Sequence, residues 1–219
     1  PGTERPDEVV IVSGHLDSWD GPGSQGASDN GTGVTSAMEA ARILMASGVR
    51  PKRTIRFVLW TGEEQGLHGS RRYVQDHAAD LPKHSAVFVD DAGAGYIGGY
   101  TVIPSQKEIF ESAIAPVQAA FPQLPMSIRV VERMPRGGGS DHSPFNAVGV
   151  PGFFTAEGGD FDYPGGYHNG RDRLARVLPK YESYLRQAGT AHAVVAFTVA
   201  NLPTLMPRDT TPPAAPTGG

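Results

Sequence analysis

The sequence predicts an α/β fold, a three-layer sandwich in which helices flank a central, mostly parallel, twisted sheet. Short apolar segments rich in β-branched residues alternate with longer segments whose apolar residues recur at helical spacing. The first such segment, residues 9–13, is apolar at nearly every position, which is expected for a strand covered on both faces. Residues able to ligate a metal follow several of these segments, at the edge where α/β sheets place their sites.

Composition limits the classes of function. The 219 residues are enough for one domain with a hydrophobic core. A net charge of −4 argues against nucleic acid as a partner, because DNA binding requires a positive face. The chain has no cysteine, so only His, Asp and Glu remain as strong metal ligands. No apolar run approaches the roughly 20 residues of a membrane span.

The domain organisation is expected to be simple. We predict one domain over residues 1–206 and a proline-rich tail or linker over residues 207–219. The chain starts at Pro1, a few residues before a core strand, and this start predicts a trimmed or processed end. The absence of a visible targeting segment therefore carries little weight.

The first predicted helix covers residues 31–47. Gly48 follows it and is expected to be its C-terminal cap, because glycine readily adopts the left-handed backbone conformation. The segment is expected to be an amphipathic helix, because Val34, Met38, Ala41 and Met45 recur at three- or four-residue steps, with Ala37 and Leu44 beside them.

The remaining elements follow from similar patterns. Further strands are predicted at residues 54–61, 84–91, 127–132 and 150–155, and further helices at 70–80, 105–121 and 179–201. Residues 95–104 stay open between strand and loop. In the second of these helices Ser105 and Glu108 predict a capping box, and Pro116 is expected to kink or shorten it. The last helix is expected to begin at Pro179 and to bury the stripe of Tyr181, Leu185, Ala188, Ala191, Val195 and Val199.

Ionisable side chains follow the predicted strands or lie in glycine-rich loops. They form four groups: His15, Asp17 and Asp29; Glu63 and Glu64; Asp90 and Asp91; and His168. Each group alone has a structural explanation, because a lone histidine or a pair of glutamates is commonly surface and Asp-Asn-Gly is commonly a turn. Converging at one sheet edge, these carboxylates would repel one another unless cations lay between them. The pattern therefore indicates a two-metal hydrolytic centre with His15 and Asp29 among its ligands.

Six motifs occur in a defined order between residues 14 and 172: GHLDSWD, GASDNGTG, TGEEQGLHGS, DAG, SDHSPF and YHNGRD. In this order they resemble the co-catalytic zinc exopeptidases of peptidase family M28. The GHLDSWD string is most similar to the carboxypeptidase Q-like branch, of the plasma glutamate carboxypeptidase type. The resemblance implies a fold of the zinc-exopeptidase type. Members have further strands before the first one here and often a protease-associated domain, so we expect such a segment to be missing from this chain.

The resemblance also implies a set of five ligands for two zinc ions: His15, Asp29, Glu64, Asp91 and His168. Asp29 would bridge both ions, and Glu64 would bind the ion of His15 or stand opposite it with His168. Asp91 is preferred to Asp90 because the family's ligand directly precedes the Ala-Gly pair.

Further roles come from the same resemblance. Glu63 would be the general base, and Asp17 would orient His15 through its second ring nitrogen. His142, in the SDH motif, would line the substrate pocket or bind the oxyanion. Tyr167 lies next to His168 in the sequence, where it would either contact the substrate or pack within its loop. For the segment before His142 the alternative is a helix cap, formed by Ser140 or Asp141. Asn30 stands where close relatives often carry a second aspartate that is not a ligand, so this departure is expected to leave the site intact.

The function predicted is that of a metal-dependent exopeptidase, an aminopeptidase or dipeptidase that hydrolyses a peptide or dipeptide with water activated by two zinc ions. One alternative is an inactive binding or receptor module, against which the filled ligand and base positions argue. Another is a glutaminyl cyclase-type acyltransferase with one zinc ion, whereas His15 and Asp91 together favour two. We expect the protein to be secreted or periplasmic.

Overall fold

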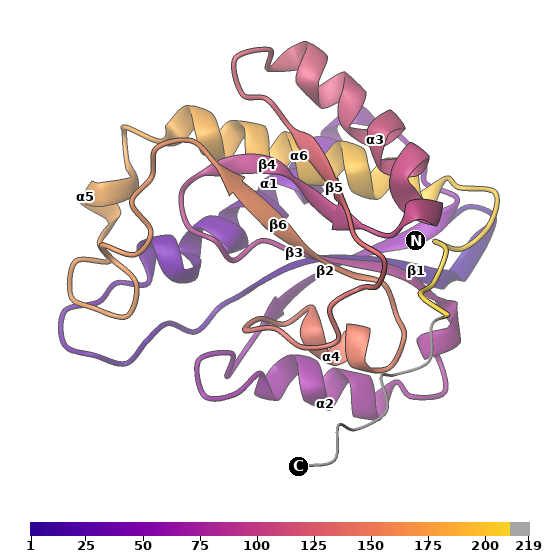
Figure 1. Ribbon diagram of the computed structural model, residues 1–219, viewed down its shortest axis with the longest axis horizontal. Helices are drawn as coiled ribbons and strands as arrows, with labels where there is room; N and C mark the ends of the chain where they lie inside the picture. Colours follow the sequence, from indigo (N-terminus) through magenta and orange to yellow (C-terminus); the bar gives the residue numbers. More distant parts are fainter. Residues whose placement is uncertain (211–219) are drawn as a thin grey trace.

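The computed structural model describes residues 1–210, and its centre is a six-stranded sheet (Figure 1). The strands lie in the order β2-β1-β3-β6-β4-β5. Strands β1, β2, β3 and β6 are mutually parallel, whereas β4 runs antiparallel to β6 and parallel to β5. The bounds are β1 Arg5–His15, β2 Arg53–Trp60, β3 His84–Val89, β4 Tyr96–Val102, β5 Ser127–Val130 and β6 Gly152–Gly158. The predicted mostly parallel sheet is therefore confirmed, and residues 95–104, left open by the sequence, supply β4.

Helices cover both faces of the sheet. Figure 1 shows α1, α3 and α6 above it and α2 and α4 below it, which makes the three layers predicted. The bounds are α1 Thr32–Ser47, α2 His68–Asp76, α3 Lys107–Ala120, α4 Ser143–Ala147, α5 Leu174–Val177 and α6 Glu182–Ala200. Within residues 1–210 no helix has both the length and the apolar character needed to cross a membrane.

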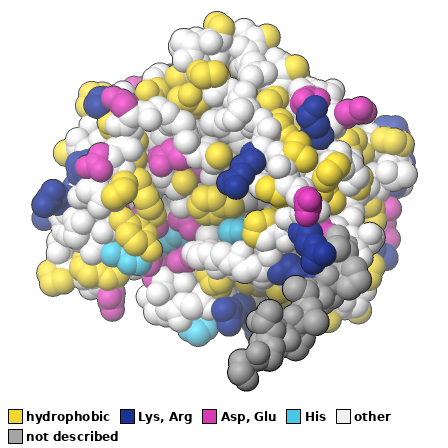
Figure 2. Space-filling model, in the orientation of Figure 1, with side chains coloured by type: hydrophobic (Ala, Val, Ile, Leu, Met, Phe, Trp, Pro, Cys, Tyr) yellow, Lys and Arg dark blue, Asp and Glu magenta, His cyan; other side chains and the backbone are white. Residues whose placement is uncertain are grey.

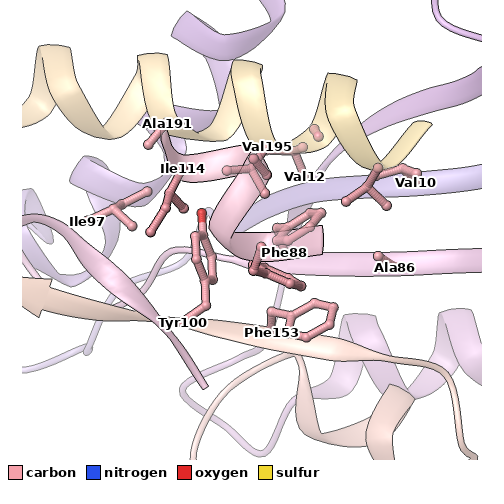
Figure 3. Close-up of a cluster of buried hydrophobic side chains, with 14 of the residues drawn as sticks. Val10, Val12, Ala86, Phe88, Ile97, Tyr100, Ile114, Phe153, Ala191 and Val195 are labelled. Atoms are coloured by element: carbon pink, nitrogen blue, oxygen red, sulfur yellow. The ribbon is translucent and has the colours of Figure 1, made fainter. Parts of the chain in front are cut away.

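The core is divided by the alternation of side chains along β1. Val10 and Val12 point into the larger cluster, where they meet Phe88 and Phe153 of the sheet and side chains of α1, α3 and α6 (Figure 3). Val9 and Ile11 point to the opposite face and pack with Trp60 and Phe145. Both faces of β1 are therefore buried, and the polar residues at its end are held by a rigid strand.

The predicted apolar stripe of α1 is wrong for Met38 and Met45, although the bounds and the cap are nearly right. Met38 is 60% exposed and Met45 is 82% exposed. The buried face includes small residues such as Ala37 and Ala40, and α1 packs closely against α6. Close approach of two helices requires small side chains rather than the most hydrophobic ones. Gly48 caps the helix as predicted, with φ of 69° and its N–H donating to the carbonyl of Met45.

The start of α3 also differs from the prediction. The capping box of Ser105 and Glu108 does not form; a short 3₁₀ turn, Pro104–Gln106, precedes the helix, and the Gln106 side chain accepts a hydrogen bond from the Ile103 N–H at 3.1 Å. The helix then continues through Pro116 to Ala120, so the proline does not shorten it.

The C-terminal helix and the segment after it close the domain. Helix α6 starts at Glu182 rather than Pro179, and its predicted stripe is buried except for the half-buried Leu185. After the helix, the Arg208 guanidinium donates to main-chain carbonyls at 2.9–3.2 Å, and the Asp209 carboxylate accepts the N–H of Met134. Residues 207–209 of the predicted tail are thus held by the domain, and residues 211–219 lie outside the described part.

Candidate metal centre and active site

The five predicted ligands converge at one edge of the sheet. Strands β1, β2 and β3 are parallel, so the residues that follow them meet at their carboxyl ends. His15 is the last residue of β1, while Glu64 follows β2 and Asp91 follows β3. Asp29 lies in the short helical segment Ala27–Gly31 that leads into α1, and His168 lies in the loop after β6.

The first group of candidate ligands is centred on His15. Its Nε2 lies 3.1 Å from Asp29 Oδ1 and 3.0 Å from Asp91 Oδ1, and all three residues are buried. Burial alone lowers the pKa of His15, but the two hydrogen-bonded carboxylates outweigh it and raise the pKa to about 11. Burial also raises the pKa of Asp91. Both pKa shifts are expected where carboxylates are crowded together away from water, because a proton on the histidine or on a carboxylate reduces their mutual repulsion.

The second group is centred on His168. Its Nε2 lies 2.7 Å from Glu64 Oε2 and 3.5 Å from Asp29 Oδ2. Asp29 therefore turns one carboxylate oxygen toward each histidine. Of the two positions that the sequence left open for Glu64, the structure places it with His168. Burial and the neighbouring Asp29 carboxylate raise the pKa of Glu64.

The donor set suits zinc. Asp29 Oδ2 and Glu64 Oε1 are buried and have no hydrogen-bond partner within residues 1–210, which leaves lone pairs there that a cation would satisfy. Zinc ligands at about 2.0–2.2 Å in a tetrahedral shell stand roughly 3.3 Å from one another. The spacings of 2.7–3.5 Å between the histidine nitrogens and the carboxylate oxygens bracket that value. The nitrogen and oxygen types also match those that zinc prefers.

Asp17 contacts the second ring nitrogen of His15 through its main chain. The main-chain carbonyl of Asp17 lies 2.8 Å from His15 Nδ1, whereas its carboxylate is 3.8 Å away. The carboxylate instead accepts the main-chain N–H groups of Glu63 and Glu64, both at 3.2 Å. A single residue therefore directs the His15 ring and holds the loop that carries the two glutamates.

Asp172 supports the candidate site, although no sequence pattern singled it out. Its buried carboxylate accepts hydrogen bonds from the N–H and hydroxyl of Ser28, both at 2.7 Å, and from the N–H of Asp29 at 3.0 Å. It thereby ties the loop of His168 to the loop of Asp29. Its place in the YHNGRD motif was the available signal, but no pattern of spacing pointed to these partners.

The residues around Asp91 explain why it, and not Asp90, faces the site. Ser140 donates its hydroxyl to Asp91 Oδ2 at 2.5 Å. Asp90 points into the core, where its carboxylate accepts the hydroxyls of Ser36 and Thr155. Asn30 binds the main-chain carbonyl of Asp90 at 2.8 Å, so the asparagine has a structural role beside the site.

The alternative of a helix cap at Ser140 or Asp141 is wrong. Helix α4 begins at Ser143 after His142, without a side-chain cap. Ser140 binds Asp91 as described, and Asp141 accepts the Ser70 hydroxyl at 2.5 Å. Both side chains are therefore turned to partners outside α4, and the loop is shaped by contacts with Asp91 and α2.

A cavity of about 320 Å³ opens onto the two groups. Its lining residues are Asp29, Glu63, Asp91, Gly139, His142, Phe154, Tyr163, Tyr167 and His168. Figure 2 shows acidic and histidine side chains gathered together on the left half of this face, beside hydrophobic ones. Both predicted substrate contacts, His142 and Tyr167, are among the lining residues. Tyr163 is a further lining residue that no sequence pattern indicated.

The ionisation of the cavity walls follows from their burial. Glu63 is buried and near Asp91, and these two effects raise its pKa to about 8. Burial lowers the pKa of His142 to about 4, and its Nδ1 has no hydrogen-bond partner. Tyr167 stacks on the His168 ring with centroids 3.8 Å apart. The cavity thus presents a carboxyl group, a neutral imidazole and aromatic surface next to the ligand groups.

Comparison with known proteins places the chain. A model of peptidase family M28 matches residues 1–193. The chain belongs to this family. Among curated relatives, the M28 chain is 35% identical over 209 residues to carboxypeptidase Q of Bos taurus and of Homo sapiens, which covers 94% of the chain and 41% of each relative. It therefore spans about two fifths of the length of these relatives.

Solved structures agree with this assignment. An M28 peptidase precursor from Shewanella amazonensis is 32% identical with a TM-score of 0.78, covering 96% of the chain and 45% of that protein. A zinc aminopeptidase from Bacillus subtilis is 27% identical with a TM-score of 0.66, covering 90% of the chain and 47% of that protein. The predicted family and fold are confirmed.

Proposed function

We propose that this M28 chain is a metal-dependent exopeptidase whose centre binds two zinc ions. The observation that carries the proposal is a pair of histidine–carboxylate groups, one buried and one half-buried, that share Asp29 and leave two carboxylate oxygens without a hydrogen-bond partner among residues 1–210. His15, Asp29 and Asp91 would hold one ion, and Asp29, Glu64 and His168 the other. Three carboxylates against two divalent ions give −3 + 4 = +1, a charge that suits binding an anionic intermediate.

Two zinc ions so bound supply Lewis acidity and lower the pKa of water toward neutrality. Glu63 is the carboxylate at the cavity that belongs to neither ligand group. Its oxygen accepts the proton of the attacking water and then delivers it to the leaving amine. His142, neutral at pH 7, offers a buried ring nitrogen to a polar atom of the substrate. Tyr163 and Tyr167 narrow the cavity and exclude water from it.

The relatives support peptide hydrolysis but differ in the end of the substrate that they name, since they include carboxypeptidase Q and zinc aminopeptidases. We propose aminopeptidase or dipeptidase activity. The secreted or periplasmic location stays a prediction.

The activity is tested with aminoacyl-coumarin substrates, dipeptides and N-acetylated dipeptides, before and after treatment with a chelator. We expect cleavage of substrates with a free amine, loss of activity on chelation and recovery with zinc. Cleavage that survives complete metal removal would contradict the proposal. No hydrolysis of any substrate would favour the inactive module, and cyclisation of an N-terminal glutamine with one zinc ion per chain would favour the acyltransferase.

The role of Glu63 is tested by Glu63→Gln, which keeps the shape of the side chain but removes the base. Its kcat is expected to fall by about 10²–10⁴-fold, the usual contribution of a positioned general base. Glu111→Gln is the matched control, because Glu111 pairs with Lys107 on the outer surface of α3. A Glu63→Gln enzyme with wild-type kcat would remove Glu63 from the mechanism.

A further inference from the structure

A second cavity of about 230 Å³ adjoins the first one. The two share His142 and Phe154 as walls, so a substrate bound beside the ligand groups has this space next to it. The other lining residues are Thr101, Met134, Pro135, Asn146, Gly152, Thr155, Ala156 and Glu157. No residue that the proposed mechanism uses, apart from His142, lies in this cavity.

Glu157 gives the second cavity its charge. It is the one carboxylate among the lining residues described, and none of them is lysine or arginine. His142 is neutral at pH 7, because burial lowers its pKa to about 4. No ion pair of Glu157 is found among the described residues. The residue reaches solvent on one side, yet burial raises the pKa of its carboxyl to about 7. A cationic group that enters the cavity would stabilise the ionised form of this carboxyl, because no lysine or arginine lines the cavity.

The carboxylate of Glu157 is held in place. Its Oε1 accepts the N–H of Gly95 at 2.6 Å, at the end of the loop that follows Asp91. The contact is close: a Cβ added at Gly95 would lie 2.0 Å from Glu157 Cγ. A carboxylate with one oxygen fixed by the main chain presents the other oxygen in a set direction, which lowers the entropic cost of binding a cation.

The remaining walls suit an aliphatic stem. Met134, Pro135, Phe154 and Ala156 offer apolar surface on the way to Glu157. Lysine side chains combine these two requirements, because their methylene groups pack on apolar surface while the ammonium reaches a polar partner. Leucine-like side chains would fill the apolar part and leave the carboxylate without a partner.

Resting on the proposed peptidase function, we infer that this second cavity is a subsite for a cationic, lysine-like side chain of the substrate, which Glu157 selects. The charge can come from the residue before the scissile bond or from the one after it. Both sources present the same ammonium group to Glu157, so they are distinguished by the choice of substrates.

The test compares lysine with norleucine, which has the same stem without the ammonium. Lysyl- and norleucyl-coumarin place the side chain before the scissile bond, and alanyl-lysine and alanyl-norleucine place it after. In the zinc-loaded wild type we expect kcat/KM to favour lysine about tenfold in one of the two pairs. In Glu157→Gln, which keeps an oxygen for the Gly95 N–H, this ratio should fall to about one. Glu111→Gln should keep the wild-type ratio.

Equal kcat/KM for lysine and norleucine in both pairs, or an unchanged ratio in Glu157→Gln, would overturn the inference while leaving the peptidase function standing. If no substrate is cleaved, the proposed function fails, and binding decides the subsite. Lysinamide and norleucinamide are then titrated against the wild type and Glu157→Gln by calorimetry. Tighter binding of lysinamide that is lost in Glu157→Gln would support the subsite, and equal binding of the two amides would refute it.

Discussion

Asp172→Asn is the most direct test of how the centre is assembled. The substitution keeps the size of the side chain but replaces one carboxylate oxygen with an amide NH₂ group. In the native protein Oδ1 accepts two hydrogen bonds from Ser28 and Oδ2 accepts one from the Asp29 N–H. Whichever way the new amide turns, its NH₂ group faces a donor of the Asp29 loop.

The magnitude follows from the number and type of these bonds. At least one hydrogen bond to a charged group is lost and a buried N–H is left unpaired, which costs about 1.5–3 kcal/mol of stability. Asp29 belongs to both ligand groups, so a shift of its loop weakens both. Changes in residues that support metal ligands commonly reduce metal affinity by about 10–100-fold. We expect a loss of zinc affinity in this range for Asp172→Asn.

The assay is titration of the metal-free protein with zinc in competition with a chromophoric chelator, with chemical denaturation of the same samples. Asp160→Asn is the control, because Asp160 lies in the same region but pairs with Lys180 at the surface. It should bind zinc as the wild type does. Zinc affinity within twofold of the wild type for Asp172→Asn, in a protein of unchanged stability, would refute the reasoning.

Three further outcomes are expected. Gly33→Ala should destabilise the domain by about 3 kcal/mol in denaturant titrations, because the added Cβ would lie 2.0 Å from the main-chain oxygen of Asp90. Gly137→Ala is the control and should be neutral, because no described atom lies within 4 Å of its added Cβ. Because the folded pKa of His142 is about 4 and the usual value is 6.5, the unfolded chain binds more protons between these values, and stability falls there as the pH is lowered. From pH 7 to pH 4 the wild type should therefore lose about 3 kcal/mol more than His142→Asn; equal slopes would contradict the burial of a neutral ring. Ser140→Ala removes the hydroxyl donor to Asp91 and should lower zinc affinity about tenfold by the same chelator assay.

Much of the scaffold could be predicted because its signals are local. The unbroken apolar run of β1 and the terminal Gly48 of α1 report burial and backbone conformation at their own positions. The same holds for the stripe of α6, whose apolar residues recur with the period of the helix. Errors occurred where local preference met a tertiary constraint, as in α1, whose exposed Met38 and Met45 were expected to be buried.

The residue types of the candidate site could also be predicted from the sequence, because ordered motifs place His, Asp and Glu after the predicted strands and in the loops. What only the folded chain decided is which of these groups meet. Glu64 pairs with His168, Asp17 directs His15 with its carbonyl rather than its carboxylate, and Asp172 holds the loop of Asp29 from 143 residues away in the chain. The physical reason is range: periodicity and turn preference act over a few residues, whereas these contacts depend on how loops from different strands pack against one another.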